Sequence, residues 1–512
     1  MRCRFAFGGW FLCACLACAG PSASSLAPKA ASPQFMAWGD PARATRIAAA
    51  ADELSPFVAK FAEEAKVPGL VVGIVAEGKL VWFRGWGVRN VASRDPVDTD
   101  TVFRIASMTK AFVSAAVLQL RDEGKLSLDV PVDTYLPELR SVKYPTSDSA
   151  PITLRDLLSH GSGLPEDNAG ADLRLPMTEA EFDHALAAGV SFSTSPGTEF
   201  EYSNLGFMLA ARVISRVSGV PFQEYVSRHL LQPLGMEGST FDARAVPESH
   251  RALGYGRRGS DMPSQGLAKY EDDAFHEEVA LEDGAGAGAG GLWTSPRDYA
   301  RWVAFLLSAW PARDGLEAGP VRRASIRETQ RAHTAFPLWG ERDESGALEI
   351  YSGGYGFGWN VLSTCRWPLR VSHAGGLPGY GSYVVLLPGE GLGIFAMTNL
   401  TYTGAYSLVW QLADGLQEHG LLPGRPRPVS PQITNARDDV IHLLDSFSVQ
   451  RARSLFDTNY WVYQPEQKLQ ARLAQLRATH GTCRPTADAE AQNILRGRMR
   501  LACDRGQLEL YL

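Results

Sequence analysis

A serine and a lysine lie three residues apart at the start of a long apolar segment. Ser107 and Lys110 belong to Phe-Arg-Ile-Ala-Ser-Met-Thr-Lys, the beginning of a stretch that runs from Phe103 to Glu123. In a helix this spacing places the hydroxyl and the amine on one face of the first turn. The stretch is apolar on nearly every side until Gln119, which is typical of a buried helix. Burial lowers a lysine pKa from about 10.4, so the lysine could take the serine proton near neutral pH.

Taken alone, the serine would more often cap a helix, and the lysine would be a solvated charge. Two further motifs follow along the chain: Glu-Tyr-Ser-Asn at 201–204, before a predicted helix, and His-Ala-Gly-Gly at 373–376, at the end of a predicted strand. Alone, Tyr202 would be a packing residue with a satisfied hydroxyl. His373 could likewise be a structural histidine that donates to a backbone carbonyl. The order and spacing of the three motifs favour a common site.

Length and composition limit the other classes of function. The chain has 512 residues, 45% hydrophobic and 21% charged, which predicts one large globular domain with an appendage. The net charge of -6, without a basic stripe, gives no electrostatic case for nucleic acid, and that partner class is set aside. The expected partner is a small-molecule or peptide substrate. There is no Gly-x-Ser-x-Gly motif, and His-Glu-Glu-Val-Ala at 276–280 lacks the second histidine of a zinc protease. We expect no metal and no cofactor.

The N-terminus has the pattern of an export signal. Two arginines precede an apolar core from Phe5 to Leu16, and Ala-Cys-Ala at 17–19 fits a cleavage site. Residues 1–19 are therefore predicted to be a signal peptide, and the protein to be exported, periplasmic or secreted. Lipoprotein anchoring at Cys15 or Cys18 is the alternative. No later run reaches about 18 apolar residues, so no transmembrane helix is expected in the mature chain.

The amino-acid composition changes at two further points along the chain. A Ser/Ala/Pro-rich leader precedes the main domain, and a proline-rich segment follows it. The predicted parts after the signal peptide are a flexible leader at 20–44, a main domain at 45–422, a linker at 423–431 and an accessory domain at 432–512.

The accessory domain combines predicted helices with a terminal hairpin and has no chemical motif. Helical patterns cover Asn435 to Phe456 and Pro465 to Ala478, and strands flank the turn at 504–506. Cys483 and Cys503 could close a disulfide loop worth roughly 3 kcal/mol. We interpret this domain as an accessory module or a dimerisation module.

The main domain begins and ends with strands. A helix is predicted from about Thr45 to Ala65, and most of 153–310 is helical. The expected strands are 69–76, 80–88, 356–362, 369–373, 381–387 and 392–398. These patterns predict an α/β (α+β) fold: an antiparallel sheet built from both ends of the domain and flanked by helices, a mostly helical lobe, and a small α+β appendage. The Gly/Ala-rich stretch at 282–292 is either a slack connector or a loop beside the site.

Through these three motifs and their order, the sequence resembles the serine β-lactamase and penicillin-binding-protein superfamily, specifically its class C β-lactamase-like branch. The resemblance covers about residues 45–420. Ser-x-x-Lys and Lys-Thr-Gly are signatures of that superfamily. Other segments also look like landmarks of the branch, namely 157–165, 200–207, 233–236, 290–298 and 354–359.

The resemblance implies a role for each motif residue. Ser107 would attack a carbonyl and become acylated, with Lys110 and Tyr202 sharing the general-base work. For that, the pKa of the tyrosine must fall below about 10, helped by the lysine charge. Asn204 would hold the lysine and the substrate amide. The backbone N–H groups of Ser107 and Gly376 would form the oxyanion hole.

The third motif departs from the family pattern. His373 with Gly375 stands where many β-lactamases have a lysine that meets the substrate carboxylate, and a neutral imidazole is a weaker partner. Arg366 and Arg370 are near in sequence. His160 is interpreted as a loop-fixing residue. The resemblance therefore implies an esterase or a D-amino-acid peptidase. A class C-like β-lactamase and a non-catalytic penicillin-recognising sensor or pseudoenzyme are the alternatives.

Overall fold

The computed structural model describes residues 40–258, 272–279, 281–342, 346, 348–423, 429–486, 490–493 and 495–511. The predicted signal peptide, most of the leader and most of the linker lie outside these residues. The chain divides into two compact units. The first extends to Pro388 and resumes over Leu392–Gly415, and the second consists of Gly389–Gly391 and Leu416–Leu512.

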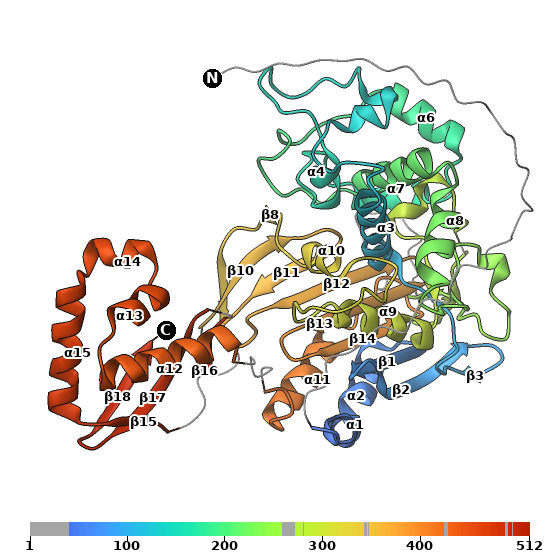
Figure 1. Ribbon diagram of the computed structural model, residues 1–512. Coiled ribbons are helices and arrows are strands. Elements are labelled where there is room, and N and C mark those ends of the chain that lie inside the picture. Colours follow the sequence, from blue (N-terminus) through green and yellow to red (C-terminus); the bar gives the residue numbers. More distant parts are fainter. Residues whose placement is uncertain are drawn as a thin grey trace, which may run out of the picture. The chain divides into compact units, whose positions relative to one another are not determined.

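The first unit is built on one antiparallel sheet from both ends of its sequence (Figure 1). The strand order is β3-β2-β1-β14-β13-β12-β11-β10-β8, and β9 pairs with β10. The N-terminal and C-terminal parts join where Leu70 pairs with Thr398. The strands are β1 (Gly69–Ala76), β2 (Lys79–Asn90), β3 (Asp95–Pro96), β8 (Thr334–Ala335), β9 (Trp339–Arg342), β10 (Leu348–Tyr355), β11 (Asn360–Ser363), β12 (Arg370–Leu377), β13 (Tyr380–Leu387) and β14 (Leu392–Thr398). The predicted single sheet is confirmed.

Helices flank the sheet and build a separate helical lobe in the same unit. They are α1 (Arg43–Glu53), α2 (Pro56–Ala65), α3 (Lys110–Asp122), α4 (Leu154–Leu158), α5 (Asn168–Ala171), α6 (Glu179–Ala187), α7 (Asn204–Ser218), α8 (Phe222–Val226), α9 (Pro296–Ser308), α10 (Arg323–Thr329) and α11 (Tyr406–Glu418). In this unit, α9 packs against β1, β2 and β14, while α7 packs against α3, α4 and α8. Short pairs β4 (Phe103–Arg104) with β7 (Trp293–Thr294) and β5 (Tyr255–Gly256) with β6 (His276–Glu277) complete the unit. The predicted fold class is confirmed.

Two predicted elements of this unit were wrong in their bounds, and in the second unit the helical pattern from Asn435 to Phe456 forms two helices, Pro431–Asp445 and Val449–Leu455. The helix predicted from Thr45 to Ala65 is two helices, because Pro56 lacks an N–H donor and its ring clashes with the preceding turn. The strand predicted at 356–362 is a turn followed by β11. Gly356 donates to the carbonyl of Trp359 across a tight turn, and Gly358 within that turn has a φ of +76°, outside the extended region.

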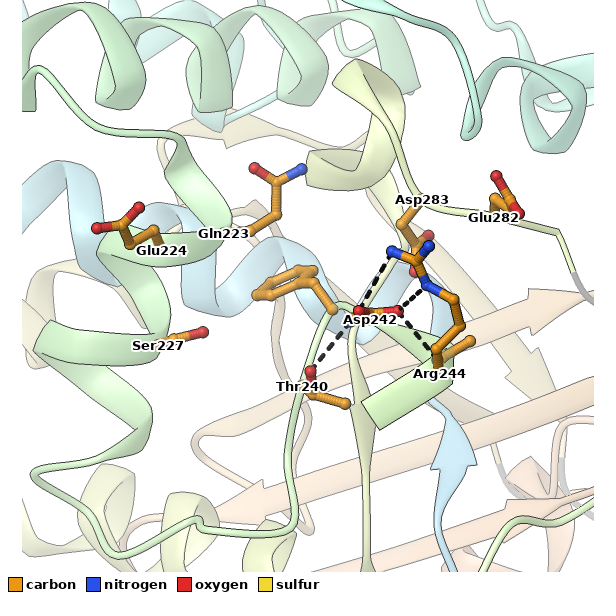
Figure 2. Close-up of a pocket in the computed structure, with 10 residues that line it drawn as sticks. Gln223, Glu224, Ser227, Thr240, Asp242, Arg244, Glu282 and Asp283 are labelled. Carbon is orange, nitrogen blue, oxygen red and sulfur yellow. Dashed lines mark hydrogen bonds and ion pairs between the residues drawn. The ribbon is translucent and has the colours of Figure 1, made fainter. Parts of the chain in front are cut away.

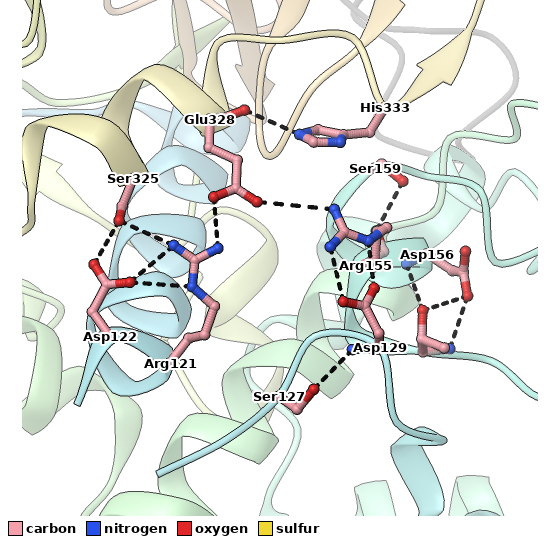
Figure 3. Close-up of polar contacts among 11 residues, drawn as sticks. Arg121, Asp122, Ser127, Asp129, Arg155, Asp156, Ser159, Ser325, Glu328 and His333 are labelled. Carbon is pink, nitrogen blue, oxygen red and sulfur yellow. Dashed lines mark hydrogen bonds and ion pairs between the residues drawn. The ribbon is translucent and has the colours of Figure 1, made fainter. Parts of the chain in front are cut away.

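A polar network fixes the C-terminal end of α3, opposite the end that carries Lys110. Arg121 donates to Glu328 at 2.6 Å and to Asp122 at 2.9 Å. Arg155 of α4 donates to Asp129 at 2.6 Å and lies 3.9 Å from the same glutamate (Figure 3). The network ties α3 to α10, α4 and the loop before α4. These contacts therefore fix the C-terminal end of α3 against the neighbouring elements.

Within the described residues, no single helix is long and apolar enough to cross a membrane. One bent pair, Asn204–Ser218 with Phe222–Leu231, meets the length and composition test only when its two parts are joined.

The second unit has two small apolar cores and a disulfide. Its helices are α12 (Pro431–Asp445), α13 (Val449–Leu455), α14 (Thr458–Tyr463) and α15 (Glu466–His480); its strands are β15 (Cys483–Pro485), β16 (Glu490–Ala491), β17 (Gly497–Cys503) and β18 (Gln507–Tyr511). Cys483 is bonded to Cys503, which confirms the predicted disulfide. The cores centre on Ile433 with Leu501, and on Leu443 with Leu469.

Candidate active site

Ser107 lies in a tight turn rather than inside the helix itself. The 3-10 turn η1 covers Ala106–Thr109, and α3 begins at Lys110. The lysine ammonium nitrogen lies 3.1 Å from the serine Oγ. The prediction that these two side chains meet at a helix start is confirmed, although the serine belongs to the turn that leads into the helix. Sequence spacing alone does not distinguish an α-helical from a 3-10 turn here.

Lys110 is fully buried and makes three contacts at hydrogen-bond distance. Besides Ser107, its Nζ donates to Oδ1 of Asn204 at 2.7 Å and to the carbonyl of Ala289 at 2.8 Å. Burial lowers the lysine pKa to about 7, against the opposing charges of Asp167 and Asp172. At neutral pH a substantial fraction of the side chain is therefore the free amine, which can accept the serine proton.

Tyr202 stands beside this pair with its hydroxyl as a neutral group. Lys110 Nζ lies 5.0 Å from the centroid of the tyrosine ring. Burial raises the tyrosine pKa above its usual value, against a smaller opposing effect of the side-chain hydrogen bond with Ser107. The predicted fall of this pKa was therefore wrong. Loss of hydration is the largest cause, and the nearby carboxylates of Asp167, Glu166 and Asp172 raise the pKa further. The phenol is a proton donor in this state.

His160 holds the tyrosine motif from behind, as predicted for a loop-fixing residue. Its Nδ1 accepts from the backbone N–H of Ser203 at 3.0 Å, and its carbonyl accepts from the N–H of Glu201 at 2.9 Å. Its ring lies 4.2 Å from the ring of Tyr202. Burial lowers the histidine pKa well below its usual value, so the ring is neutral. These contacts fix the residues on both sides of the tyrosine.

Asn204 begins α7 and is held by a carboxylate that the sequence analysis missed. Asp167 accepts from the backbone N–H of Asn204 at 2.7 Å and from that of Leu205 at 3.1 Å. The asparagine Nδ2 also donates to Asp167 at 3.2 Å and to Asn168 at 3.0 Å. Asp167 thus satisfies free N–H groups at the helix start and orients the asparagine oxygen toward Lys110. The predicted contact of Asn204 with the lysine is confirmed, and its contact with substrate stays a prediction.

The His373 side chain forms hydrogen bonds within the protein at both nitrogens. Its Nδ1 lies 2.6 Å from the carbonyl of Ala374, so this nitrogen carries the proton, and its Nε2 accepts from the hydroxyl of Tyr355 at 2.7 Å. Burial lowers the imidazole pKa to about 3, so the ring is neutral. This geometry matches the structural alternative for His373. A substrate role for the residue stays a prediction.

Neither arginine near the third motif in sequence is a lining residue of the pocket beside Ser107. Arg370 stacks on Trp410 at 3.9 Å from the ring centroid, and Arg366 pairs with Asp414 at 3.2 Å.

The glycines of β12 allow the strand to approach the serine turn. A Cβ on Gly375 would lie 2.2 Å from the carbonyl oxygen of Ile105, so the close approach needs glycine there. Gly376 and Ser107 line one small pocket, as expected for two oxyanion-hole donors. The pocket volume is about 30 Å³, and its walls are Ser107, Asn168, Asp172, Leu175, Asn204, Ala289, Gly290, Gly376, Leu377 and Tyr402.

The Gly/Ala-rich stretch is a loop beside the site, which resolves the two alternatives left by the sequence. Ala285–Ala289 forms the buried 3-10 turn η8, and the carbonyl at its end accepts from Lys110. A Cβ on Gly288 would lie 2.4 Å from Cβ of Ala211 in α7. The small residues therefore let this backbone pass close to α7 and reach the lysine.

Sequence reasoning missed Asp167, Asp172 and Tyr402, which carry no motif of their own. The Tyr402 hydroxyl donates to Oδ2 of Asp172, and both residues line the pocket beside Ser107. The two aspartates lie in one short segment, 230 residues before Tyr402 in the case of Asp172, so only the fold brings the tyrosine to them. No periodic or spacing signal in a single sequence could have found them.

A larger pocket, of about 370 Å³, is lined by none of the predicted site residues. It lies between α8 and the segments around Asp242 and Asp283. Figure 2 shows Arg244 in its wall, where the guanidinium donates to Asp242 at 3.0 Å. Asp283 is paired with the buried Arg104, which follows Phe103 in β4.

Comparisons with known proteins agree with this arrangement. The family model described as Beta-lactamase matches residues 54–417. Protein flp of Staphylococcus aureus (strain MW2) is 27% identical over 358 residues, which cover 70% of this chain and 64% of that protein. The chain thus spans less than two thirds of that relative. D-alanyl-D-alanine-carboxypeptidase/endopeptidase AmpH of Escherichia coli (strain K12) is 26% identical over 67% of this chain and 82% of its own length.

Solved structures show the same fold. The octameric penicillin-binding protein homologue from Pyrococcus abyssi aligns with a TM-score of 0.57 and 22% identity, over 90% of both chains. A class C beta-lactamase aligns with a TM-score of 0.54 and 19% identity, over 72% of this chain and 96% of that one. The family match over most of the chain, together with this fold, shows that the protein belongs to the beta-lactamase family within the serine β-lactamase and penicillin-binding-protein superfamily.

Proposed function

We propose that this chain is an exported serine hydrolase that forms an acyl-enzyme at Ser107 with an ester or amide substrate. One observation carries the proposal. The serine Oγ lies 3.1 Å from the amine of a fully buried lysine whose pKa is lowered to about 7. A nucleophile with an adjacent base of matched pKa is the arrangement that covalent catalysis requires.

The geometry supports a defined path for the proton. The neutral amine of Lys110 takes the Ser107 proton as Oγ bonds to the substrate carbonyl carbon. The carbonyl oxygen becomes an oxyanion, facing the backbone N–H groups of Ser107 and Gly376. As the bond to the leaving group breaks, the Tyr202 hydroxyl gives it a proton and regains one from the lysine ammonium. A water molecule then attacks the acyl carbon of the acyl-enzyme. Its proton passes through Tyr202 and Lys110 to the Ser107 oxygen, and the carboxylic acid leaves.

The surroundings of the serine favour an esterase or D-amino-acid peptidase over a β-lactamase. Among the residues that the structure describes, no arginine or histidine lines the pocket beside Ser107, and Lys110 contacts the serine itself. A β-lactam carries a carboxylate that would lack a fixed cationic partner there. The AmpH relative is named a carboxypeptidase and endopeptidase, and the endopeptidase part of that name supports amide substrates without a carboxylate next to the scissile bond.

Labelling of the purified protein with a fluorophosphonate, followed by intact mass, tests the proposal. We expect a stoichiometric adduct that Ser107→Ala abolishes and Ser114→Ala retains. Ser114 is a matched control because it is a buried serine of α3, the helix that follows the Ser107 turn. A penicillin in the same assay separates three outcomes: a transient adduct supports an enzyme, a lasting one a sensor, and the absence of both adducts a pseudoenzyme. Rapid cephalosporin hydrolysis lost in Ser107→Ala would replace the esterase proposal with the β-lactamase alternative.

Export and assembly belong to the same proposal. The signal pattern at 1–19 and the disulfide between Cys483 and Cys503 support an oxidising compartment, periplasmic or extracellular. N-terminal sequencing of the mature protein tests cleavage near Gly20 against lipid attachment at Cys15 or Cys18. A dimer through the second unit is tested by light scattering of the full mature chain and of a chain that ends at Leu422.

A further inference from the structure

A buried carboxyl group in the catalytic pocket has no part in the proton path described above. Asp172 begins the 3-10 turn Asp172–Arg174, is 8% exposed, and lines the same pocket as Ser107 and Gly376. Its Oδ2 accepts from the Tyr402 hydroxyl, and Tyr402 lines the same pocket. The pocket has a volume of about 30 Å³, far below the roughly 300–1,000 Å³ of ordinary ligand sites.

The charges around the pocket are asymmetric. Among the described residues that line it, Asp172 has the one ionisable carboxyl group, and no arginine, lysine or histidine lines it. The nearby arginines have other partners: Arg104 pairs with Asp283 in the interior, and Arg174 pairs with Asp167 at 3.1 Å. The pocket thus offers a substrate an anion and hydrogen-bonding groups.

We propose that Asp172 selects acyl donors that carry an ammonium group close to the scissile carbonyl, such as amides or esters of amino acids with a free amine. This inference rests on the proposed serine hydrolase function. The substrate ammonium takes the place of the Tyr402 hydroxyl as the partner of the carboxylate. A charge-assisted hydrogen bond in a partly buried site is roughly twice as strong as a neutral one. An N-acylated donor lacks that interaction, and a donor with a carboxylate at the same place is repelled.

The protonation states are compatible with this role. Burial raises the pKa of Asp172 to about 6, while the Tyr402 hydrogen bond and the charges of Arg104 and Lys110 act in the opposite direction. An α-amino group has a pKa of about 7.7–8.0. Between these values the carboxylate and the ammonium are both charged. The preference for the amine should therefore decline below about pH 6, where Asp172 gains a proton.

A pair of reversible inhibitors tests the inference without relying on turnover. Racemic 1-aminoethylboronic acid and its N-acetyl derivative differ in the charge beside the boron atom that Ser107 would attack. Each competes with fluorophosphonate labelling, so its affinity is read from the slowed labelling rate. For the unmodified protein at pH 7, we expect the amine to bind at least about tenfold more tightly than the N-acetyl compound. The ratio of the two affinities should be smaller at pH 5. Titration of Lys110 affects both compounds, whereas titration of Asp172 changes their ratio.

The variant Asp172→Asn should remove most of the preference while it leaves binding of the N-acetyl compound nearly unchanged. Asp148→Asn, an exposed aspartate with the same change in charge, should keep the ratio of the native protein. Equal affinities of the two compounds for the native protein, or a ratio that Asp172→Asn leaves unchanged, would overturn the role of Asp172 while Ser107 labelling still supports the hydrolase. If Asp172→Asn does not fold, the pH dependence of the native ratio decides. Absence of Ser107 labelling would overturn the proposed function and this inference together.

Discussion

The two units of this chain differ in the size of their apolar cores and in the covalent cross-link that the second one contains. The first buries a large apolar core, and within it places a lysine, an asparagine and two histidines that are almost completely shielded from water. The second is small, has two cores of a few side chains each, and closes a loop with a disulfide. A large core can tolerate buried polar groups whose pKa values are shifted, and a small one needs a cross-link to be stable.

The comparison suggests that chemistry and stability are separable in this protein. Every residue assigned to the proton path, Ser107, Lys110 and Tyr202, comes from the first unit. The disulfide lies entirely in the second. Changes in one unit should therefore affect acylation, and changes in the other should affect local stability. Four experiments test that separation, in order of decreasing effect.

Replacement of the lysine should have the largest effect. Lys110→Ala removes the base beside Ser107, and we expect fluorophosphonate labelling to slow by about 100-fold to 10,000-fold. Lys110→Arg should be equally slow because a guanidinium stays protonated. Stopped-flow or timed mass spectrometry gives the rate, and circular dichroism checks that both variants fold. A labelling rate within threefold of the native one would mean that another group takes the serine proton.

Removal of the disulfide should destabilise the second unit and leave the first intact. Cys483 and Cys503 are 20 residues apart, and opening such a loop costs roughly 3 kcal/mol. For the double Cys→Ser variant we expect faster hydrogen exchange in β17 and an unchanged rate of Ser107 labelling. Cys365→Ser, which changes an exposed free cysteine, is the control. Slower labelling in the double variant would show that the units are coupled.

The pH dependence of acylation should report the lysine. Its pKa is lowered to about 7, and the reaction needs the neutral amine, so the labelling rate should fall about tenfold per unit below pH 7 and level off above it. Asp172→Asn should move this midpoint to lower pH, because the charge of Asp172 raises the lysine pKa. A rate that is flat from pH 5 to pH 9 would exclude the lysine as the base.

The helix cap at Asn204 should have the smallest effect. Asp167→Asn removes the negative charge beside two backbone N–H groups at the start of α7, and we expect a loss of about 1 kcal/mol in the free energy of unfolding of the first unit. Labelling should slow by less than tenfold, because the asparagine side chain can still reach Lys110. Denaturant titration measures the stability, with Asp148→Asn as the surface control. An unchanged midpoint would show that the cap adds nothing to stability.

Much of the fold was readable from the chain because alternating and apolar patterns mark strands and helices directly. Such patterns predicted the strand at 69–76 and the hairpin around 388–391. They also predicted a single sheet made of N-terminal and C-terminal strands. The exact bounds near Pro56 and Gly358 did not follow, because a residue with restricted or unusual φ ends an element whose apolar pattern continues. The residues of the second unit from Thr458 to Tyr463 form α14, which the sequence did not predict.

The sequence by itself determined the nucleophile, its lysine and the asparagine that holds it, because these residues lie in short motifs with fixed spacing. It also determined the disulfide, since only two cysteines share the last segment. The tertiary structure alone decided protonation and selectivity. Burial sets the pKa of Lys110 near 7 and raises that of Tyr202, and folding brings Asp172 and Tyr402 together from positions 230 residues apart. Burial away from water and contact between distant segments arise only when the chain folds, so a local sequence pattern does not reveal them.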